Sequence, residues 1–274
     1  MENVLPAFLL TLMAGLATGV GAAIAFLIRK PTPRLLSTAL GFSAGVMLYV
    51  SFVEILPKAQ EAMAETHSNA AWLAVGGFFI GIAVIAIIDA MVPDVSNPHE
   101  FHDSENFLSA PGNADVLYRR DTDSRAKLMR MGSMTALALA LHNFPEGFAT
   151  FMSGLYDLDM AIPIAIAIAI HNIPEGIAVS VPIYYATGSR RKAFGLSFAS
   201  GLSEPAGALI GYFLLRGVMN DTIFGMSFAA VAGIMVYISL DELLPSAEKF
   251  GKHHHAMAGL IAGMAVMALS LLLI

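Results

Sequence analysis

The sequence predicts an all-α integral membrane protein with eight transmembrane helices, and three observations lead to this fold class. Hydrophobic residues make up 57% of the 274 residues and charged residues only 13%, whereas about 25% is usual in a soluble domain. Apolar stretches of about 20 residues, the length that crosses a bilayer core as a helix, recur along the chain. The basic residues gather in alternate connections between these stretches.

The expected spans follow one another with short connections except in one place. The first span starts near an N-terminus that carries Glu2 instead of the basic region of a signal peptide, so we interpret it as retained. The long connection 93–130 is rich in Asp, Asn, Ser and Pro, and we expect a poorly ordered, variable cytosolic loop inside one transmembrane domain over 1–274. The expected spans are approximately 5–28, 35–56, 72–92, 131–153, 159–184, 192–215, 222–245 and 256–274.

The distribution of basic residues predicts the orientation. All Lys and Arg except Lys58 and Arg216 lie in four connections, which are 29–34, 93–130, 185–192 and 246–255. Loops rich in Lys and Arg remain in the cytosol. We therefore expect both termini to lie outside. The complete absence of cysteine excludes disulfides and thiolate metal ligands.

A repeat relates spans one to three to spans six to eight. Residues 44–59 read AGVMLYVSFVEILPKA and residues 232–247 read AGIMVYISLDELLPSA, with nine of sixteen positions identical. These segments belong to the second and seventh spans, which run in opposite directions, so the repeat is inverted. The fourth and fifth spans form a further antiparallel pair with the motif HNxPEG at 142–147 and 171–176. Inverted repeats with a site near the midplane are typical of alternating-access transporters.

Apart from the first residues of the spans, seven acidic residues fall inside them, while no Lys or Arg does. A charge at the centre of a membrane helix costs about 2.5–3.5 kcal/mol on insertion scales and is normally paired. Either these carboxylates are protonated or their counter-ion comes from outside the chain, and we favour a mobile cation. The seven residues are Glu54, Asp89, Glu146, Glu175, Glu204, Asp241 and Glu242.

The middle of three spans carries the candidate metal ligands. His142 and Glu146 are four residues apart and share one face of a helix, with Asn143 beside them. Imidazole nitrogen together with amide and carboxylate oxygen suits Zn(II), Fe(II), Mn(II) or Co(II) and argues against Cu(I). The alternative is a buried hydrogen-bond network that only holds helices together. The candidates at this depth are His142, Asn143, Glu146, His171, Asn172, Glu175 and Glu204.

Prolines inside the two motifs are expected to free backbone oxygen near this site. Pro145 and Pro174 lack the N–H that would bond the carbonyls of Leu141 and Ile170. Such breaks are tolerated in a membrane where the backbone lines a cavity.

Other polar residues have two interpretations each. Glu54 and Glu242 either flank the entrance and exit of a cation path or snorkel at helix ends. Met47 could add a thioether ligand or simply pack, and Asp89 is expected to be interfacial. The histidines outside the spans either catch metal ions or belong to solvated segments, and these are His99, His102 and 253–255.

The two motifs and Glu204 resemble the signature of the ZIP (Zrt/Irt-like) family of divalent-metal transporters, and the similarity runs through all eight spans. It implies uptake of Zn(II), and of other ions such as Fe(II), Mn(II), Co(II) or Cd(II), across a bacterial cytoplasmic (inner) membrane. It also implies a homodimer in the lipid bilayer and an elevator-like movement of helices 1, 4, 5 and 6 against 2, 3, 7 and 8.

The resemblance further implies a binuclear centre in which two glutamates bridge the metals. Some family members have Asp at the position of Asn172 and Gln at that of His171, so the number of metals and the preferred ion are left open. The first metal would bind His142, Glu146, His171 and Glu175, near Met47, and the second Asn143, Glu146, Asn172, Glu175 and Glu204.

Two other classes of function were weighed against transport. A di-metal intramembrane hydrolase could use such ligands to activate water, but the chain has no HExxH motif and no nucleophile beside the motifs. A metal-sensing receptor would need a soluble output domain. We therefore expect a transporter, not an enzyme, and no nucleic-acid partner.

Overall fold

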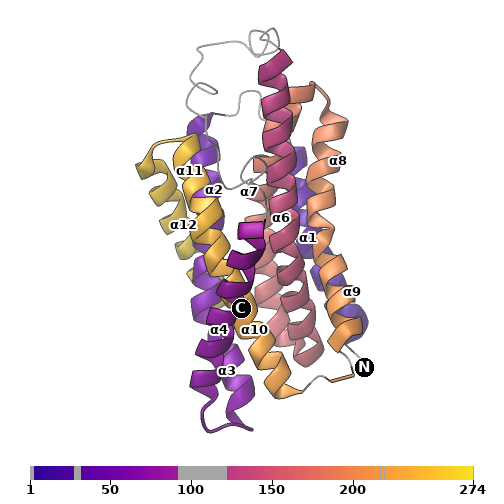
Figure 1. Cartoon of the computed structure of the whole chain (residues 1–274), viewed down its shortest axis with the longest axis vertical. Coiled ribbons are helices and arrows are strands. Elements are labelled where there is room, and N and C mark those ends of the chain that lie inside the picture. Colours follow the sequence, from indigo (N-terminus) through magenta and orange to yellow (C-terminus); the bar gives the residue numbers. More distant parts are fainter. Residues whose placement is uncertain (1–2, 28–31, 92–121, 216, 219, 274) are drawn as a thin grey trace.

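The computed structural model describes residues 3–27, 32–91, 122–215, 217–218 and 220–273, and within them all regular elements are helical. The helices run side by side along the long axis of the molecule (Figure 1). Their bounds are α1 Val4–Ala25, α2 Pro33–Val50, η1 Ser51–Ile55, α3 Leu56–Ala64, α4 Ala70–Met91, α6 Thr122–Tyr156, α7 Leu158–Thr187, α8 Arg190–Gly201, α9 Ser203–Leu215, α10 Asp221–Ile238, η2 Ser239–Leu243, α11 Leu244–Phe250 and α12 His253–Leu273.

Short capped turns make consecutive helices antiparallel. The side chain of Asp157 accepts a 2.9 Å hydrogen bond from the N–H of Asp159 and starts α7 directly after α6. Gly188 ends α7 in the left-handed conformation (φ 65°) that glycine adopts without strain. Asn220 caps α10 in the same way as Asp157 caps α7.

Helix α6 starts earlier than the sequence predicted. It begins at Thr122, so the end of the expected loop 93–130 is helical. The rest of that loop, including His99 and His102, lies outside the described residues.

Six helical stretches in the described part of the chain are long and apolar enough to cross a membrane. The all-helical prediction is therefore confirmed, while the prediction of eight spans is matched in part. Helix α6 carries a polar motif in its middle, and α8 and α9 are separate 12- and 13-residue helices because the chain breaks at Leu202. The six stretches are Val4–Ala25, Arg34–Ala64, Ala70–Ala90, Leu158–Thr187, Asp221–Lys249 and His253–Leu273.

Both copies of the repeated sequence contain a π-helical turn at the same place. The turns η1 and η2 occupy Ser51–Ile55 and Ser239–Leu243, and each is followed by a proline in the next helix. In each copy the first serine donates a 2.7 Å hydrogen bond to the carbonyl of the methionine four residues earlier. Helix α2 descends and α10 ascends in Figure 1, so the two copies run in opposite directions.

Glycines pack the helices backbone to backbone in three sets, which are α1 with α6, α7, α8 and α9, then α2 with α12, and α3 with α4 and α10. We call the first set the motif group, and the other two sets, with the connecting η1, η2 and α11, the support group. In the motif group, a Cβ on Gly21 would meet the carbonyl of Ile173 in α7, and one on Gly176 would meet the carbonyl of Thr18 in α1. In the support group, Gly45 meets Leu260 of α12 and Gly233 meets Phe78 of α4 in the same manner. Small residues at such contacts let membrane helices approach closely.

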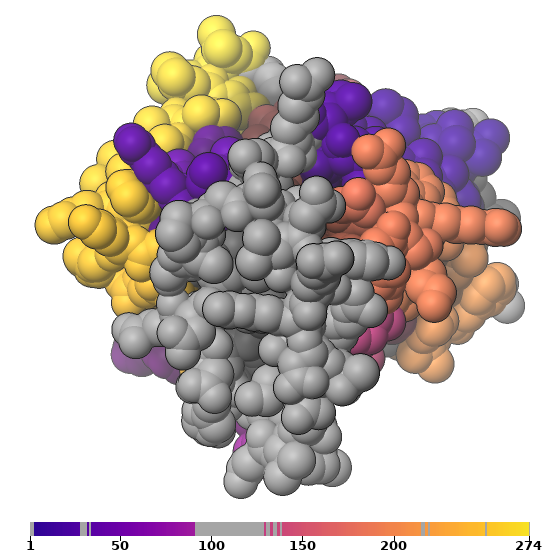
Figure 2. All heavy atoms as spheres, turned by 90° about the horizontal axis from the view of Figure 1, so that it is seen from above, coloured from indigo at the N-terminus to yellow at the C-terminus, as the bar shows by residue number. Residues whose placement is uncertain are grey.

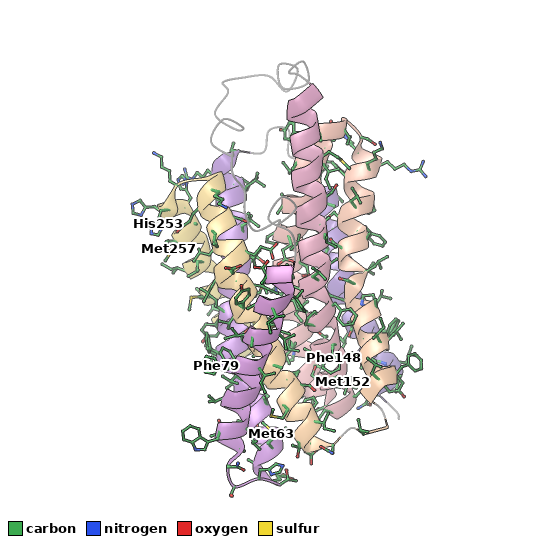
Figure 3. The ribbon with its side chains drawn as sticks, in the orientation of Figure 1. Met63, Phe79, Phe148, Met152, His253 and Met257 are labelled. Atoms are coloured by element: carbon green, nitrogen blue, oxygen red, sulfur yellow. The ribbon has the colours of Figure 1, made fainter. Side chains whose placement is uncertain are left out.

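Seen from above, α11 and α12 lie on one side of the molecule and α1 and α8 on the other (Figure 2). His253 of α12 lies near the upper end of the bundle in Figure 3, and Met63 of α3 lies near the lower end. Helix α8, which begins with the basic residues 190–192, and helix α11, which holds Lys249, reach the upper end in Figure 1, whereas α3, which holds Lys58, lies at the lower end.

Candidate metal centre

All the candidate ligands from the fourth to sixth expected spans are buried together where α6, α7 and α9 meet. Burial removes water as a partner for their polar atoms, so the protein or a bound species must supply partners. Their exposed fractions are 1% for His142 and 0% for Asn143, Glu146, His171, Asn172, Glu175 and Glu204.

The two motifs exchange partners across the interface between α6 and α7. Nε2 of His142 lies 3.2 Å from Oε2 of Glu175, and Nε2 of His171 lies 3.3 Å from Oε2 of Glu146. Each histidine is therefore within hydrogen-bond distance of the glutamate of the other motif. Because the helices are antiparallel and the motifs identical in spacing, the two pairs form one nearly symmetrical set of four side chains.

The two asparagines are fixed by backbone carbonyls. Nδ2 of Asn143 donates to the carbonyl of Ser200 at 3.4 Å, and Nδ2 of Asn172 donates to the carbonyl of Ala14 at 2.8 Å and also to Oε1 of Glu204. A carbonyl only accepts, so the amide nitrogen must face it. The amide oxygens Oδ1 are left as acceptors without a donor.

Six polar atoms of this cluster are buried without a hydrogen-bond partner. Leaving one such atom unpaired costs about 1–3 kcal/mol, so six at one place indicate a site that binds a polar or charged ligand. All six can be ligands of a divalent cation, because two are imidazole nitrogens, two are amide oxygens and two are carboxyl oxygens. The atoms are Nδ1 of His142 and of His171, Oδ1 of Asn143 and of Asn172, Oε1 of Glu146 and Oε2 of Glu204.

Two residues of the support group reach the centre. The hydroxyl of Ser43 in α2 donates a 2.9 Å hydrogen bond to Oε1 of Glu175. Oε2 of Glu242 in the π turn η2 lies 3.8 Å from Nδ1 of His142. Ser43 is not among the predicted residues, because a serine in an apolar helix carries no distinctive signal, although it directly precedes the repeated segment 44–59.

The surroundings of three further predicted candidates, Met47, Glu54 and His253, differ from one another. Met47 is fully buried in the hydrophobic core, one turn beyond Ser43 on the same face of α2. Glu54 is partly exposed on η1, with Lys58 and Glu61 as charged neighbours. His253 pairs with exposed Glu248 at 2.6 Å near the upper end of the bundle.

The prolines of the motifs do not interrupt their helices. Helix α6 runs through Pro145, and α7 runs through Pro174. The missing N–H of each proline therefore does not end its helix, and the free backbone oxygen expected at Leu141 and Ile170 stays a prediction. In this region the break falls at Leu202, directly before the helix that carries Glu204 and between two segments that pack against α1 and α6.

Within the described ranges, no three His, Asp or Glu side chains already converge as a metal-binding group. The nitrogen and oxygen donors instead face each other in pairs. A cation at this centre would therefore replace the contact between an imidazole and a carboxylate, with small rotations of these side chains.

The chain is similar to known proteins along almost its whole length. A family model described as ZIP Zinc transporter matches residues 3–89 and 94–271. A protein of Streptococcus mutans named zinc transporter ZupT is 56% identical over 274 residues, with 99% of this chain and 98% of the relative covered. Proteins of the same name from Nitratidesulfovibrio vulgaris and Corynebacterium glutamicum are 58% and 59% identical, with 99% and 97% of this chain and 98% of each relative covered.

Proposed function

The chain belongs to the ZIP zinc transporter family, and we propose that it carries Zn(II) into the cytosol through the centre between α6, α7 and α9. It is a multi-pass membrane protein and, as expected, a transporter and not an enzyme, because its relatives are named zinc transporters. The observation that carries the proposal is the pair of crossed contacts between His142 and Glu175 and between His171 and Glu146. Neutral imidazole and carboxylate together suit Zn(II).

The centre binds two ions in this proposal, with the two glutamates between them. The first ion takes the two histidines. The second takes the amide oxygens of Asn143 and Asn172, which have no donor in the protein, and the carboxylate of Glu204. Fe(II), Mn(II), Co(II) and Cd(II) are further candidate cargoes because the same donors bind them.

Eight spans arranged as an inverted repeat provide the framework in our proposal. The π turns η1 and η2 at matching positions support it. So do reciprocal glycine contacts, since Gly45 packs on α12 as Gly233 packs on α4. In this arrangement α6 crosses the membrane, and α8 and α9 together cross it at the side of the bundle with an exposed apolar face, while neighbouring helices cover polar residues such as Glu204.

Transport in this proposal moves the motif group against the support group. Where a Cβ added to a described glycine would collide with the backbone of another helix, that helix belongs to the same group as the glycine. At the centre, side chains of the support group make the polar contacts between the groups, since Ser43 donates to Glu175 and to the carbonyl of His171, and Glu242 approaches His142. Side-chain contacts can slide or exchange, whereas interlocked backbones cannot, so this boundary is the natural plane of movement.

Zinc enters the cytosol at the upper end of the bundle in this proposal, and both termini face outside a bacterial inner membrane. The basic segments 190–192 and 249–252 support this orientation. Glu54 and Glu242 flank the path, one on each π turn. A homodimer in the bilayer is part of the proposal by family membership.

Zinc uptake into proteoliposomes tests the proposed function. Glu146→Ala and Glu175→Ala should each abolish uptake, because each removes a bridging carboxylate from both ions. Glu248→Ala is a matched control, since Glu248 is an exposed glutamate near the upper end. Uptake that persists in both variants would exclude the centre, and zinc loss from loaded cells would exclude import.

A further inference from the structure

Thr18 of α1 is fully buried, and its hydroxyl has no hydrogen-bond partner. A threonine in a helix usually donates to the carbonyl four residues earlier, as Thr11 does to Ala7 at 3.0 Å. For Thr18 that carbonyl belongs to Ala14, which accepts from Asn172. The helical N–H and the amide of Asn172 together occupy both lone pairs of the Ala14 carbonyl oxygen. The hydroxyl of Thr18 therefore finds no acceptor there.

Helix α1 and the segment α8–α9 make equivalent contacts with the two motifs. The carbonyl of Ala14 accepts from Asn172, and the carbonyl of Ser200 accepts from Asn143. The backbone of Gly15 lies against that of Gly201, and each would obstruct a Cβ on the other. In the second segment, every equivalent residue stands 186 positions after its counterpart in α1.

This equivalence places Thr18 where the other half of the centre has Glu204. The Cβ of Glu204 lies against Gly15, and the Cβ of Thr18 lies against Gly201. Glu204 accepts a hydrogen bond from Asn172, so the corresponding neighbour of Thr18 is Asn143. The amide oxygen of Asn143 and the hydroxyl oxygen of Thr18 are both buried without a partner.

We propose that Thr18 is a specificity-determining residue of the metal centre, whose hydroxyl supplies a neutral oxygen ligand beside Asn143 where the other half supplies the carboxylate of Glu204. The inference rests on the proposed function. Two neutral oxygens favour an oxygen-preferring ion such as Mn(II) over an ion that favours nitrogen and sulfur, such as Zn(II). The asymmetry between hydroxyl and carboxylate therefore sets how well the centre accepts Mn(II).

Metal titration of the purified full-length protein in detergent tests this role. Thr18→Val should weaken Mn(II) binding about fivefold, the size of one net hydrogen bond, and change Zn(II) binding by less than about twofold. Thr18→Ser keeps the hydroxyl and should keep the Mn(II) affinity. Thr11→Val is the matched control, a buried threonine of the same helix whose hydroxyl already has a partner.

Thermal unfolding without metal separates this role from a structural one. Removing a buried hydroxyl that has no partner should leave Thr18→Val at least as stable as the parent. A less stable variant would overturn the proposal, and so would an unchanged ratio of Mn(II) to Zn(II) affinity. If the parent binds neither ion, the proposed function fails as well, whereas binding by the parent with no effect of Thr18→Val refutes only the role of Thr18.

Discussion

His142 in α6 pairs with Glu175 in α7 across the helix boundary, with Nε2 and Oε2 3.2 Å apart. The equivalent pair, His171 and Glu146, crosses in the opposite sense at 3.3 Å. The crossing means that neither motif is complete alone. Each helix supplies one imidazole and one carboxylate to a set that exists only when both helices are in place.

Exchanging the partners of one pair should rescue binding. His142→Ala and Glu175→Ala should each reduce zinc affinity by more than about tenfold, because each leaves a buried polar partner unpaired. The double variant His142→Glu with Glu175→His restores one imidazole and one carboxylate at the same contact. We expect it to bind zinc more tightly than His142→Glu alone, as a double-mutant cycle by calorimetry would measure. Strict additivity of the two exchanges would contradict the pairing.

Asn172→Asp should make the metal-free protein less stable and should increase the stabilisation by zinc. The aspartate would turn an acceptor toward the carbonyl of Ala14 and toward Glu204, which costs about 1–3 kcal/mol. A divalent cation offsets the added charge, so zinc should raise the melting temperature more than in the parent. Asn220→Asp is the control, because Asn220 caps α10 and Asp caps equally well. Equal responses of both variants to zinc would refute the prediction.

Gly147→Ala should destabilise the motif group. Its Cβ would collide with the backbone carbonyl of Glu204, and overpacking of this kind costs about 1–3 kcal/mol. Gly195→Ala is the matched control on α8, where nothing lies within 4 Å of the new Cβ and alanine favours the helix. Unfolding in detergent should show a lower midpoint for Gly147→Ala alone. The close packing is disproved if the two variants unfold at the same temperature.

Ser43→Ala should weaken the centre from the side of the support group. The hydroxyl of Ser43 donates to the carboxylate of Glu175, and a hydrogen bond to a charged group contributes about 1.5–3 kcal/mol. We expect zinc uptake to fall by about tenfold or more. Ser37→Ala is the control, since Ser37 is buried on the same helix and its hydroxyl has no partner. A larger loss in the control would show that Ser43 is incidental.

The absence of cysteine makes the proposed orientation directly measurable. Ser68→Cys lies in the exposed turn before α4 and should react with a membrane-impermeant maleimide added to intact cells. Lys252→Cys lies in the exposed turn before α12 and should react only after permeabilisation. The reverse pattern of labelling would invert the orientation and therefore the direction of transport.

The sequence predicted the parts of the fold that depend on local pattern. The apolar stretches of about 20 residues predicted most of the helices. The four-residue spacing of His142 and Glu146 correctly predicted that both lie on one face of α6. Membership of the ZIP family followed from the two motifs and is confirmed by the family model. The role of each ligand stays a prediction.

Features that depend on contacts between helices could not be predicted in this way. Helical periodicity cannot show that His142 faces Glu175 instead of Glu146, because the exchange depends on how α6 and α7 are set against each other. The extra residue of a π turn leaves no mark in an apolar sequence, so η1 and η2 were not expected. Pro145 was expected to leave the carbonyl of Leu141 without its usual partner, and the sequence alone could not show that α6 continues through that position.

The grouping of the glycine contacts also constrains biosynthesis. Gly21 of α1 packs against Ile173 of α7, and Gly15 of α1 packs against Gly201 of α8. Ile173 and Gly201 are synthesised long after α1. We therefore expect α1 to enter the bilayer before the helices against which it packs have been synthesised. Assembly of the motif group is then a late event between helices that are already inserted. A truncation before α8 would leave α1 with an exposed glycine surface, which cellular quality control can recognise as unfinished.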